Sequence, residues 1–286
     1  MLDPFFCAQR YENSHSNFTN LYMWRKPYHI HWAVEDGVLY LINEWAGKVQ
    51  MLQPFGPKER MQGAIARVIA WFQQQGAPLF FVGLERSFTE ELDAFPDADF
   101  DVQADRDNFD YVYLAENLIH LTGRKYHSKK NHLNSFHKAY PQAEYLPITR
   151  DIIPQCREEL NRWYRMRSAE LPDDPFIGYE LAAIHEVFDH FGDFKLQGGA
   201  VRIDDSIVAF TFGEQTNEDT AVIHVEKADP DVRGAYPAIN QGFVAHAWSD
   251  MTYINREEDM GLEGLRKAKE SYKPVKMIEK FNAKLR

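Results

Sequence analysis

Hydrophobic positions recur with the period of a strand or a helix in the first part of the chain. Two β-rich runs, 29–34 and 38–43, flank Glu35-Asp36-Gly37, and an Asp-Gly turn between such runs predicts a β-hairpin. Residues 58–75 carry apolar side chains at helical spacing, and Gly76 ends the helix that they predict. The other elements predicted here are a strand at 78–84, a helix at 89–95 and a strand at 110–114.

The second part opens with a basic helix and repeats the alternation of strands and helices. Residues 123–140 predict a helix with five basic and no acidic side chains. Pro237 fits the first turn of a later helix, where its missing N–H costs nothing. The elements predicted after the basic helix are a strand at 143–148, helices at 152–167 and 178–191, a meander of strands at 198–203, 207–212 and 221–227, a helix at 235–248, a strand at 251–255 and a helix at 262–272.

The two parts resemble each other. A turn at Asp36-Gly37 precedes a hydrophobic strand, and so does a turn at Asp205-Ser206, about 170 residues later and far beyond solenoid periods. A helix and a strand follow in both cases. The pattern predicts an α+β protein made of two similar domains, 1–122 and 142–286, with a basic linker helix at 123–141.

Charge restricts the possible partners. The chain has 32 basic and 43 acidic side chains and a formal charge of −11, which argues against sequence-blind adhesion to nucleic acid or anionic lipid. Two segments reverse this balance locally, 121–140 and the stretch from 256 to the end. A single anionic ligand, including a phosphate-bearing donor or tRNA, is therefore still compatible with the sequence.

The cysteines and histidines predict neither a disulfide framework nor a metal-binding motif. Cys7 and Cys156 cannot form a disulfide scaffold, so we expect a cytoplasmic protein with free thiols. The histidines show no HExxH pattern, and we expect no metal. The start of the sequence lacks signal-peptide features and no long apolar run is present, so we expect no stable membrane insertion. The oligomeric state is left open.

Two segments carry candidate chemistry. The turn Arg233-Gly234-Ala235-Tyr236 lies between a predicted strand and helix, where backbone N–H groups suit a phosphate or carboxylate. Taken alone this signal is weak, and the alternative is an ordinary strand–helix turn with Gly for conformation and Pro237 as a helix starter. Residues 255–274 begin with Asn255, include Asp259, and place Arg266, Lys269 and Lys273 on one helix stripe. This stripe is either a seat for phosphates or a solvated basic face.

These segments resemble a known family. The tandem layout and the motifs at 18–24, 123–132, 233–235, 255–261 and 265–274 resemble bacterial proteins related to the C-terminal domain of phosphatidylglycerol lysyltransferase. The motifs extend over nearly the whole chain, and the last block is the most specific.

The resemblance implies two GNAT-like domains akin to Fem-type aminoacyltransferases, each with a mixed, largely antiparallel sheet flanked by helices. It implies a soluble enzyme that moves an acyl or aminoacyl group from acyl-CoA or aminoacyl-tRNA to an amine or hydroxyl. The Arg233 turn has a single glycine, fewer than acetyl-CoA-binding GNAT enzymes usually have. Pro54-Phe55-Gly56-Pro57 at the corresponding place offers few N–H donors, which argues against donor binding in the first half. A lipid acceptor is not implied.

Within this resemblance, two residues are candidates for the chemistry. Glu226 could take a proton from the attacking group, directly or through water, and Tyr272 could protonate the leaving group. Arg233 to Tyr236, Arg266, Lys269 and Lys273 are the expected donor-binding groups, with Asn255 and Asp259 as further motif residues. The alternative is a non-catalytic GNAT-fold protein that binds a phosphate-bearing or peptide ligand. In that case Glu226 would pair with Lys227 or Arg233, and Tyr272 would be a core residue.

Overall fold

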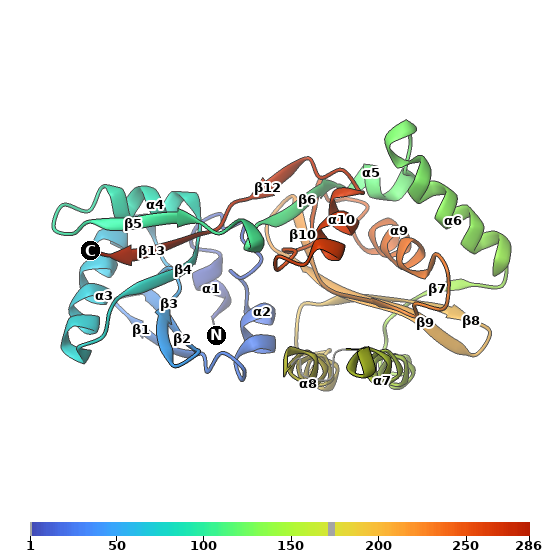
Figure 1. The fold of residues 1–286 in the computed structure, drawn as a ribbon, viewed down its shortest axis with the longest axis horizontal. Helices are drawn as coiled ribbons and strands as arrows, with labels where there is room; N and C mark the ends of the chain where they lie inside the picture. Colours follow the sequence, from blue (N-terminus) through green and yellow to red (C-terminus); the bar gives the residue numbers. More distant parts are fainter. Residues whose placement is uncertain (1, 171–174) are drawn as a thin grey trace. The chain divides into compact units, whose positions relative to one another are not determined.

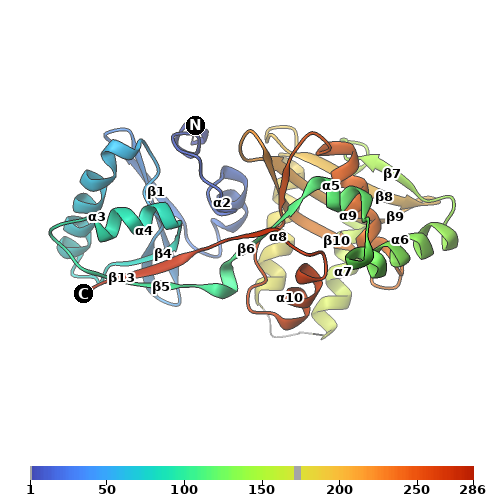
Figure 2. The same ribbon diagram turned by 90° about the horizontal axis from the view of Figure 1, so that it is seen from above.

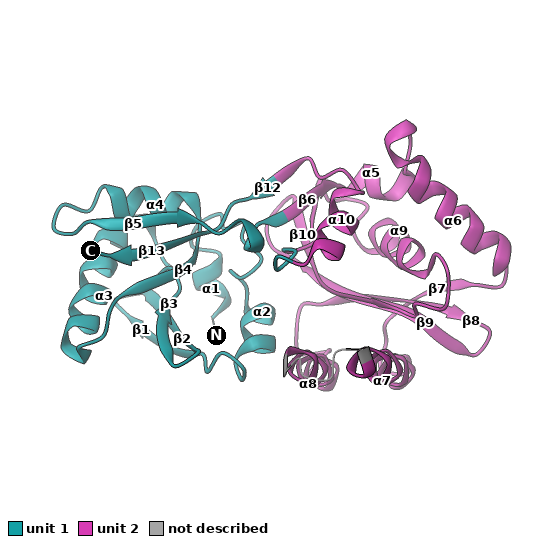
Figure 3. Cartoon of the chain, in the orientation of Figure 1, with its two compact units in different colours: residues 1–110, 258–261, 277–286 teal, residues 111–257, 262–276 magenta. Residues whose placement is uncertain are grey.

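The computed structural model describes residues 2–170 and 175–286 of the chain. It forms two compact units (Figure 3): unit 1 comprises residues 1–110, 258–261 and 277–286, and unit 2 comprises residues 111–257 and 262–276. Each unit has its own sheet and its own helices. Within the described residues, no helix is both long enough and apolar enough to cross a bilayer.

Unit 1 is built on a sheet that its described residues form in the order β1-β2-β3-β4-β13-β5 (Figure 1). All neighbouring strands are antiparallel except β3 and β4. Its elements are α1 (Asp3–Phe6), α2 (Phe18–Trp24), β1 (His31–Glu35), β2 (Val38–Trp45), β3 (Lys48–Met51), α3 (Met61–Gln75), β4 (Phe80–Leu84), α4 (Arg86–Asp93), β5 (Phe100–Ala104) and β13 (Phe281–Leu285).

The pleat of β2 divides the core of unit 1 between the two faces of the sheet. Val38 belongs to a cluster with the apolar face of α3, whereas Leu39 and Leu41 pack with Phe55 and the N-terminal segment. Alternate side chains of a strand point to opposite faces, so one strand contributes to both clusters. The predicted hairpin and the predicted end of α3 are confirmed, the latter by the left-handed conformation of Gly76 (φ 63°).

Unit 2 contains the sheet β12-β6-β11-β10-β9-β8-β7, in which β10 and β11 are parallel. Helices α7 and α8 lie on one face of the sheet, and α5, α6 and α9 on the other (Figures 1 and 2). Its elements are β6 (Asp110–Leu114), α5 (Ala115–His120), α6 (His127–Ala139), β7 (Glu144–Pro147), α7 (Ile153–Glu170), α8 (Pro175–Asp189), β8 (Gln197–Ile203), β9 (Ser206–Gln215), β10 (Thr220–Ala228), α9 (Ala235–Ala247), β11 (Tyr253–Asn255), α10 (Glu263–Glu270) and β12 (Lys276–Ile278).

The predicted repeat is visible in the order of elements. The series β1-β2-β3-α3-β4-α4-β5 in unit 1 corresponds to β8-β9-β10-α9-β11-α10-β12 in the second half of the chain. In both series the parallel pair flanks the long helix, through β3 and β4 or through β10 and β11. The α+β class is confirmed, with mixed, largely antiparallel sheets flanked by helices.

The bounds of the units differ from the predicted 1–122, 123–141 and 142–286. The reason is that each half of the chain contributes one strand to the sheet that is built mainly from the other half. β6 follows β5 in the chain but is inserted between β11 and β12, whereas β13 follows β12 but is inserted between β4 and β5. The basic helix α6 packs on α9, so the segment expected to be a linker is part of unit 2.

Candidate functional site

Polar side chains meet in unit 2 where the parallel strands β10 and β11 part. The two strands pair up to Val222 and Asn255. Glu226 lies on β10 beyond this point, and Arg256 directly follows β11. Arg256 Nη2 donates to Glu226 Oε1 at 2.9 Å, so an ion pair spans the diverging strands.

The second carboxylate oxygen of Glu226 is also engaged. Asn240 of α9 donates from Nδ2 to Glu226 Oε2 at 2.9 Å. Asn240 is buried against the sheet, and only 12–13% of the Glu226 and Arg256 side chains is exposed. A carboxylate held by two donors in a mostly buried setting has a fixed orientation. Its predicted alternative partners, Lys227 and Arg233, are not the ones that the structure shows: Lys227 pairs with Glu180.

Two tyrosines and a lysine complete the cluster around Arg256. The guanidinium carbon lies 4.8 Å from the ring centroid of Tyr272 and 5.6 Å from that of Tyr113. The two rings meet edge to face, with their centroids 6.4 Å apart. Lys129 Nζ of α6 lies 4.3 Å from the Tyr272 centroid, so two cations contact this ring. The structure therefore brings the two predicted catalytic residues, Glu226 and Tyr272, to one guanidinium.

Burial governs the protonation of these groups. It raises the pKa of Tyr272 and of Tyr113, although the charge of Arg256 opposes the shift. Burial lowers the pKa of Lys129, and the neighbouring Arg256 lowers it further. Burial also disfavours the charge of Arg256, but Glu226 outweighs this effect, with the two tyrosines, and raises its pKa. At neutral pH the cluster thus holds a charged guanidinium and protonated tyrosine hydroxyls.

Two buried polar atoms of this cluster have no hydrogen-bond partner within the described part of the chain. Among the described residues, the buried Arg256 Nη1 has no hydrogen-bond partner, and neither does the buried Asn240 Oδ1. Most buried polar atoms in folded proteins are paired, so such atoms need an explanation. One is a donor and the other an acceptor, and both side chains bind the same carboxylate. The pair could accept a ligand that carries a carbonyl oxygen next to an N–H or O–H group.

The predicted phosphate-binding turn has a different environment. Gly234 is left-handed (φ 92°), and a Cβ built on it would lie 2.8 Å from His132 O and from Phe136 Cβ of α6. Arg233 is exposed and Ala235 is buried. The glycine is thus explained by its conformation and by the packing of α6, without a ligand.

Tyr236 extends this turn on the side of α7 and α8. Its hydroxyl is bonded to Trp163 and to the backbone of Ala228, while burial raises its pKa. Close by, Lys227 Nζ lies 4.0 Å from the Trp163 centroid and 2.8 Å from Glu180 Oε2. The four predicted residues of the turn therefore do not join the Arg256 cluster.

The predicted basic stripe is also divided. Lys269 is buried, and its ammonium donates to the carbonyl of Arg256 and, at 3.2 Å, to that of Glu257. It holds the loop after β11 rather than facing outward. Arg266 is half-buried, and Lys273 is exposed beyond the end of α10 at Glu270. The helix is shorter than predicted, so the three side chains do not form one face.

The motif residues after β11 are held by separate partners. Within unit 2, Asn255 Oδ1 accepts from the Glu257 backbone N–H at 2.8 Å, and Glu257 Oε1 lies 2.9 Å from His224 Nδ1. Within unit 1, the fully buried Asp259 accepts from the Gly261 N–H at 2.9 Å and pairs with Arg106 at 3.3 Å. Asn255 and Asp259 thus act in turns, which is a structural role.

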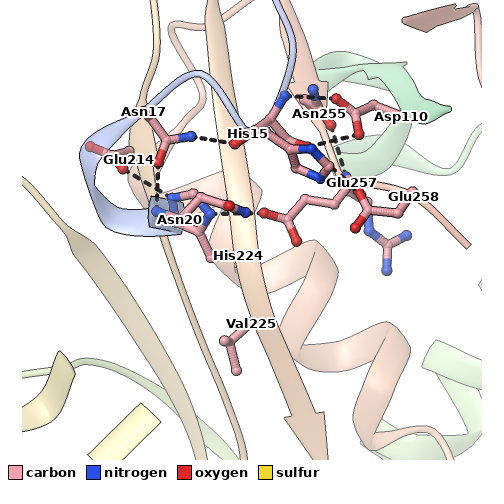
Figure 4. A network of polar contacts seen from close by, with 12 residues as sticks. His15, Asn17, Asn20, Asp110, Glu214, His224, Val225, Asn255, Glu257 and Glu258 are labelled. Carbon is pink, nitrogen blue, oxygen red and sulfur yellow. Dashed lines mark hydrogen bonds and ion pairs between the residues drawn. The ribbon is translucent and has the colours of Figure 1, made fainter. Parts of the chain in front are cut away.

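His224 marks an irregularity of β10. It lies where the register with β9 shifts, and its ring is held between Glu214 at 3.0 Å and Glu257 at 2.9 Å (Figure 4). Its side chain is 1% exposed. Burial would lower its pKa, but the hydrogen bonds to the two carboxylates outweigh burial and raise the pKa to about 9. Within the described residues, no group of three or more His, Cys, Asp or Glu side chains could hold a metal ion.

Sequence reasoning missed four members of the cluster as site residues. They come from separate elements: Tyr113, Lys129, Asn240 and Arg256. Arg256 stands inside a motif that the sequence singles out, so its position next to the buried strand was an available signal. For Tyr113 and Asn240, an uncommon polar group on an apolar strand or helix was the only signal.

The comparisons with known proteins point to one family. Residues 8–284 match the family described as phosphatidylglycerol lysyltransferase, C-terminal. A conserved protein of unknown function from Bacteroides thetaiotaomicron is 33% identical, with 99% of this chain and 96% of that one covered and a TM-score of 0.92. An uncharacterised protein of Mycoplasmoides gallisepticum is 25% identical over 175 residues, or 61% of this chain. That match spans only 56% of the length of the curated relative.

More distant structures share the fold. L-PGS from Bacillus licheniformis is 14% identical, with 99% of this chain and 90% of that one covered and a TM-score of 0.71. The C-terminal domain of a putative lysylphosphatidylglycerol synthetase from Agrobacterium fabrum is 13% identical, covers 94% and 87%, and has a TM-score of 0.67. The family match extends over nearly the whole described chain and includes every residue of the Arg256 cluster. The chain belongs to the family of the phosphatidylglycerol lysyltransferase C-terminal domain.

Proposed function

We propose that this protein transfers an acyl or aminoacyl group from a CoA thioester or an aminoacyl-tRNA to an amine or hydroxyl acceptor, and that the reaction takes place at the Arg256 cluster. One observation carries the proposal. A buried guanidinium with an unused N–H, among the described residues, lies beside a buried amide with an unused carbonyl oxygen. The acyl carbonyl and the attacking group of such a reaction need these two partners.

In the proposed reaction, the nitrogen or oxygen of the acceptor attacks the acyl carbon. The negative charge that develops on the carbonyl oxygen is stabilised by Arg256 Nη1. Glu226 receives the proton of the acceptor through water, since its own oxygens are bonded to Arg256 and Asn240. The bond to sulfur or to the ribose oxygen then breaks, and Tyr272 protonates the leaving group. Its raised pKa keeps the hydroxyl protonated until that step.

The family defines the first substrates to test. Its name points to a lysyl group as the cargo and phosphatidylglycerol as the acceptor, so lysyl-tRNA with phosphatidylglycerol vesicles is one pair. Other aminoacyl-tRNAs and acyl-CoAs, with free amines as acceptors, form the wider panel. The proposal places the enzyme in the cytoplasm, which cell fractionation would test.

A second candidate is a binding protein without catalysis. It is favoured by the packing of α6 against Gly234, because this turn is where GNAT enzymes hold donor phosphates. A protein of this kind would bind a phosphate-bearing or peptide ligand elsewhere on the fold. It would show ligand-dependent stabilisation but no transfer.

The experiment measures transfer of a radiolabelled acyl group, together with the melting temperature in the presence of each donor. Tyr272→Phe keeps the ring that contacts Arg256 and removes only the hydroxyl, and we expect kcat to fall by about 10²–10⁴ with little change in KM. Arg256→Lys should lower kcat by about 10²–10³. Tyr179→Phe, on the exposed side of α8, is the matched control.

The outcomes separate the alternatives. Transfer that depends on Tyr272 and Arg256 but not on Tyr179 supports the proposal. Transfer that both variants retain would overturn the assignment of the site. A donor that raises the melting temperature without any transfer would identify a binding protein. No transfer and no stabilisation over the whole panel would refute both functions.

A further inference from the structure

A hollow lies in unit 2, bounded by α7, by the start of β9 and by the residue that follows β10. Its volume is about 500 Å³, which is in the range of small-molecule sites. Ile207 and Val208 are buried in its wall, while Asp205 and Glu158 are exposed around it. None of these residues belongs to the Arg256 cluster.

Two buried acceptors of α7 line this hollow. Gln155 and Glu159 are four residues apart, so they share one face of the helix. Glu159 Oε1 and Gln155 Oε1 are both buried and have no hydrogen-bond partner among the described residues. Glu159 is 5% exposed, so water reaches little of its carboxylate. Two acceptors without a donor, lining one hollow, call for a ligand with several N–H groups.

The charges already present do not satisfy these acceptors. Arg162 donates from Nε to Glu159 Oε2 at 3.0 Å and from Nη2 to Asp229. Arg162 thus shares one positive charge between the carboxylates of Glu159 and Asp229. Its contacts leave Glu159 Oε1 without a donor among the described residues. Burial raises the pKa of Glu159, and the charge and hydrogen bond of Arg162 oppose this shift. With four acidic and two basic side chains, the lining is acidic overall.

We propose that this hollow binds the primary ammonium group of a small aliphatic amine. An ammonium has three N–H donors, one each for Glu159 Oε1 and Gln155 Oε1 and one to spare. The hollow is far larger than a bare metal ion needs, and its size fits an organic molecule with an alkyl chain against Ile207 and Val208. The rim carboxylates of Glu158 and Asp205 would attract a second positive charge, so a diamine should bind better than a monoamine.

This site is independent of the proposed transfer reaction. Its ligand would contact α7 and the start of β9, whereas the cluster of Glu226 lies between β10, α9 and α6. The amine site can therefore be tested by binding alone. A failed transfer assay would leave the amine site standing, and the absence of amine binding would leave the transfer proposal standing.

The test is isothermal titration of the full chain with 1,4-diaminobutane, n-butylamine and tetramethylammonium at equal ionic strength. Tetramethylammonium carries the charge but no N–H donor. We expect one 1,4-diaminobutane per chain, weaker binding of n-butylamine, and none of tetramethylammonium. Glu159→Gln should weaken 1,4-diaminobutane at least tenfold. Glu116→Gln removes a charge from an exposed position of α5 outside the hollow and should leave the affinity unchanged.

Three results would overturn the proposal: no binding heat with either amine, equal binding of tetramethylammonium, or unchanged affinity in Glu159→Gln. The last result is expected if the Gln155 amide is rotated so that its NH2 group donates to Glu159 Oε1 and no ligand is needed. If Glu159→Gln fails to fold, Asp205→Asn on the exposed turn replaces it. A several-fold loss relative to Glu116→Gln then supports the site, and equal affinities reject it.

Discussion

Replacing Lys280 with Met removes the only cation that is fully buried within the described part of unit 1. The side chains of Lys280 and Asp110 are both 0% exposed, and Lys280 Nζ lies 2.7 Å from Asp110 Oδ1. It lies 3.0 Å from Glu258 Oε2, 3.0 Å from Ser14 Oγ and 3.1 Å from His15 Nε2. Figure 4 shows His15, Asp110 and Glu258 of this group. One ammonium thus joins the N-terminal segment, the start of β6, the loop after β11 and the C-terminal segment.

The magnitude follows from what the substitution leaves behind. Methionine fills a similar volume, so the cavity contribution is small. The two carboxylates, however, lose their counter-charge in a site that excludes water. Removing one partner of a buried ion pair costs about 3–5 kcal/mol of unfolding free energy. Since a domain has about 5–15 kcal/mol in total, the variant should lose about a fifth or more of its stability.

The pH dependence gives the sharper test. In the wild type, burial would raise the pKa of Glu258, but Lys280 and His15 outweigh burial and hold it well below the usual value. A carboxylate with a depressed pKa stabilises the fold above its unfolded pKa of about 4.3, and this stability is lost as the pH falls through the folded value. Without Lys280 the pKa of Glu258 should rise. The fold of the variant should then gain stability on acidification between about pH 7 and pH 5.

The assay is urea unfolding of the full chain, followed by circular dichroism from pH 5 to pH 8. Lys284→Met on the exposed side of β13 is the matched control and should cost less than about 0.5 kcal/mol. Adding Glu258→Gln to Lys280→Met removes one of the two uncompensated charges and should recover part of the loss. A destabilisation below about 1 kcal/mol, or a Lys280→Met variant with the same pH slope as the wild type, would refute the reasoning.

Three further changes test the fold. Gly234→Ala should destabilise the protein by about 1–3 kcal/mol in thermal unfolding, because Gly234 has a positive φ and an added Cβ would lie 2.8 Å from His132 O. Its control is Gly264→Ala in α10, where an added Cβ meets open space. That substitution should be neutral or stabilising by up to about 1 kcal/mol. Deleting residues 281–286 removes β13 from between β4 and β5 and should abolish cooperative unfolding of unit 1 in hydrogen exchange; protection of β5 that survives would contradict the topology. His224 has a folded pKa of about 9, so its stabilisation should be complete below about pH 6.5 and lost as the pH rises through 9, on the order of 3 kcal/mol. The difference in unfolding free energy between wild type and His224→Gln should shrink over that range, and a flat difference would be the contrary result.

Periodicity predicted the long elements well because each buries one continuous apolar face. The helix α3 and the meander β8-β9-β10 lie close to their predicted positions. The short strands β3 and β5 were missed, since four or five residues with exposed members carry little periodic signal. Periodicity does not predict that β6 and β13 each join the sheet built mainly from the other half of the chain. A strand pattern says that a segment pairs, but it does not say which sheet it joins.

The candidate site shows the same division between local pattern and long-range placement. The family resemblance makes Glu226 and Tyr272 candidates for the chemistry, and the structure places both at Arg256. Lys269 was expected to face a ligand, but it turns inward because the loop after β11 presents two carbonyls to it. The direction of that loop depends on contacts distant in sequence, which helical spacing cannot reveal.

The repeat also suggests why only one half carries the proposed chemistry. By element order, the residue after β4 in unit 1 corresponds to the residue after β11 in unit 2, so Glu85 stands where Arg256 stands. Glu85 is buried and accepts from the backbone N–H groups of Glu12 and Asn13 at 3.0 and 2.8 Å. Its pKa is raised by burial to about 7, and its own N–H donates to Gln53 Oε1. In unit 1 the N-terminal segment thus fills the place after the parallel pair, whereas in unit 2 the corresponding guanidinium retains an unused N–H among the described residues. In a duplicated fold of which one copy is closed by its own chain, the other copy is the one available for the proposed substrate.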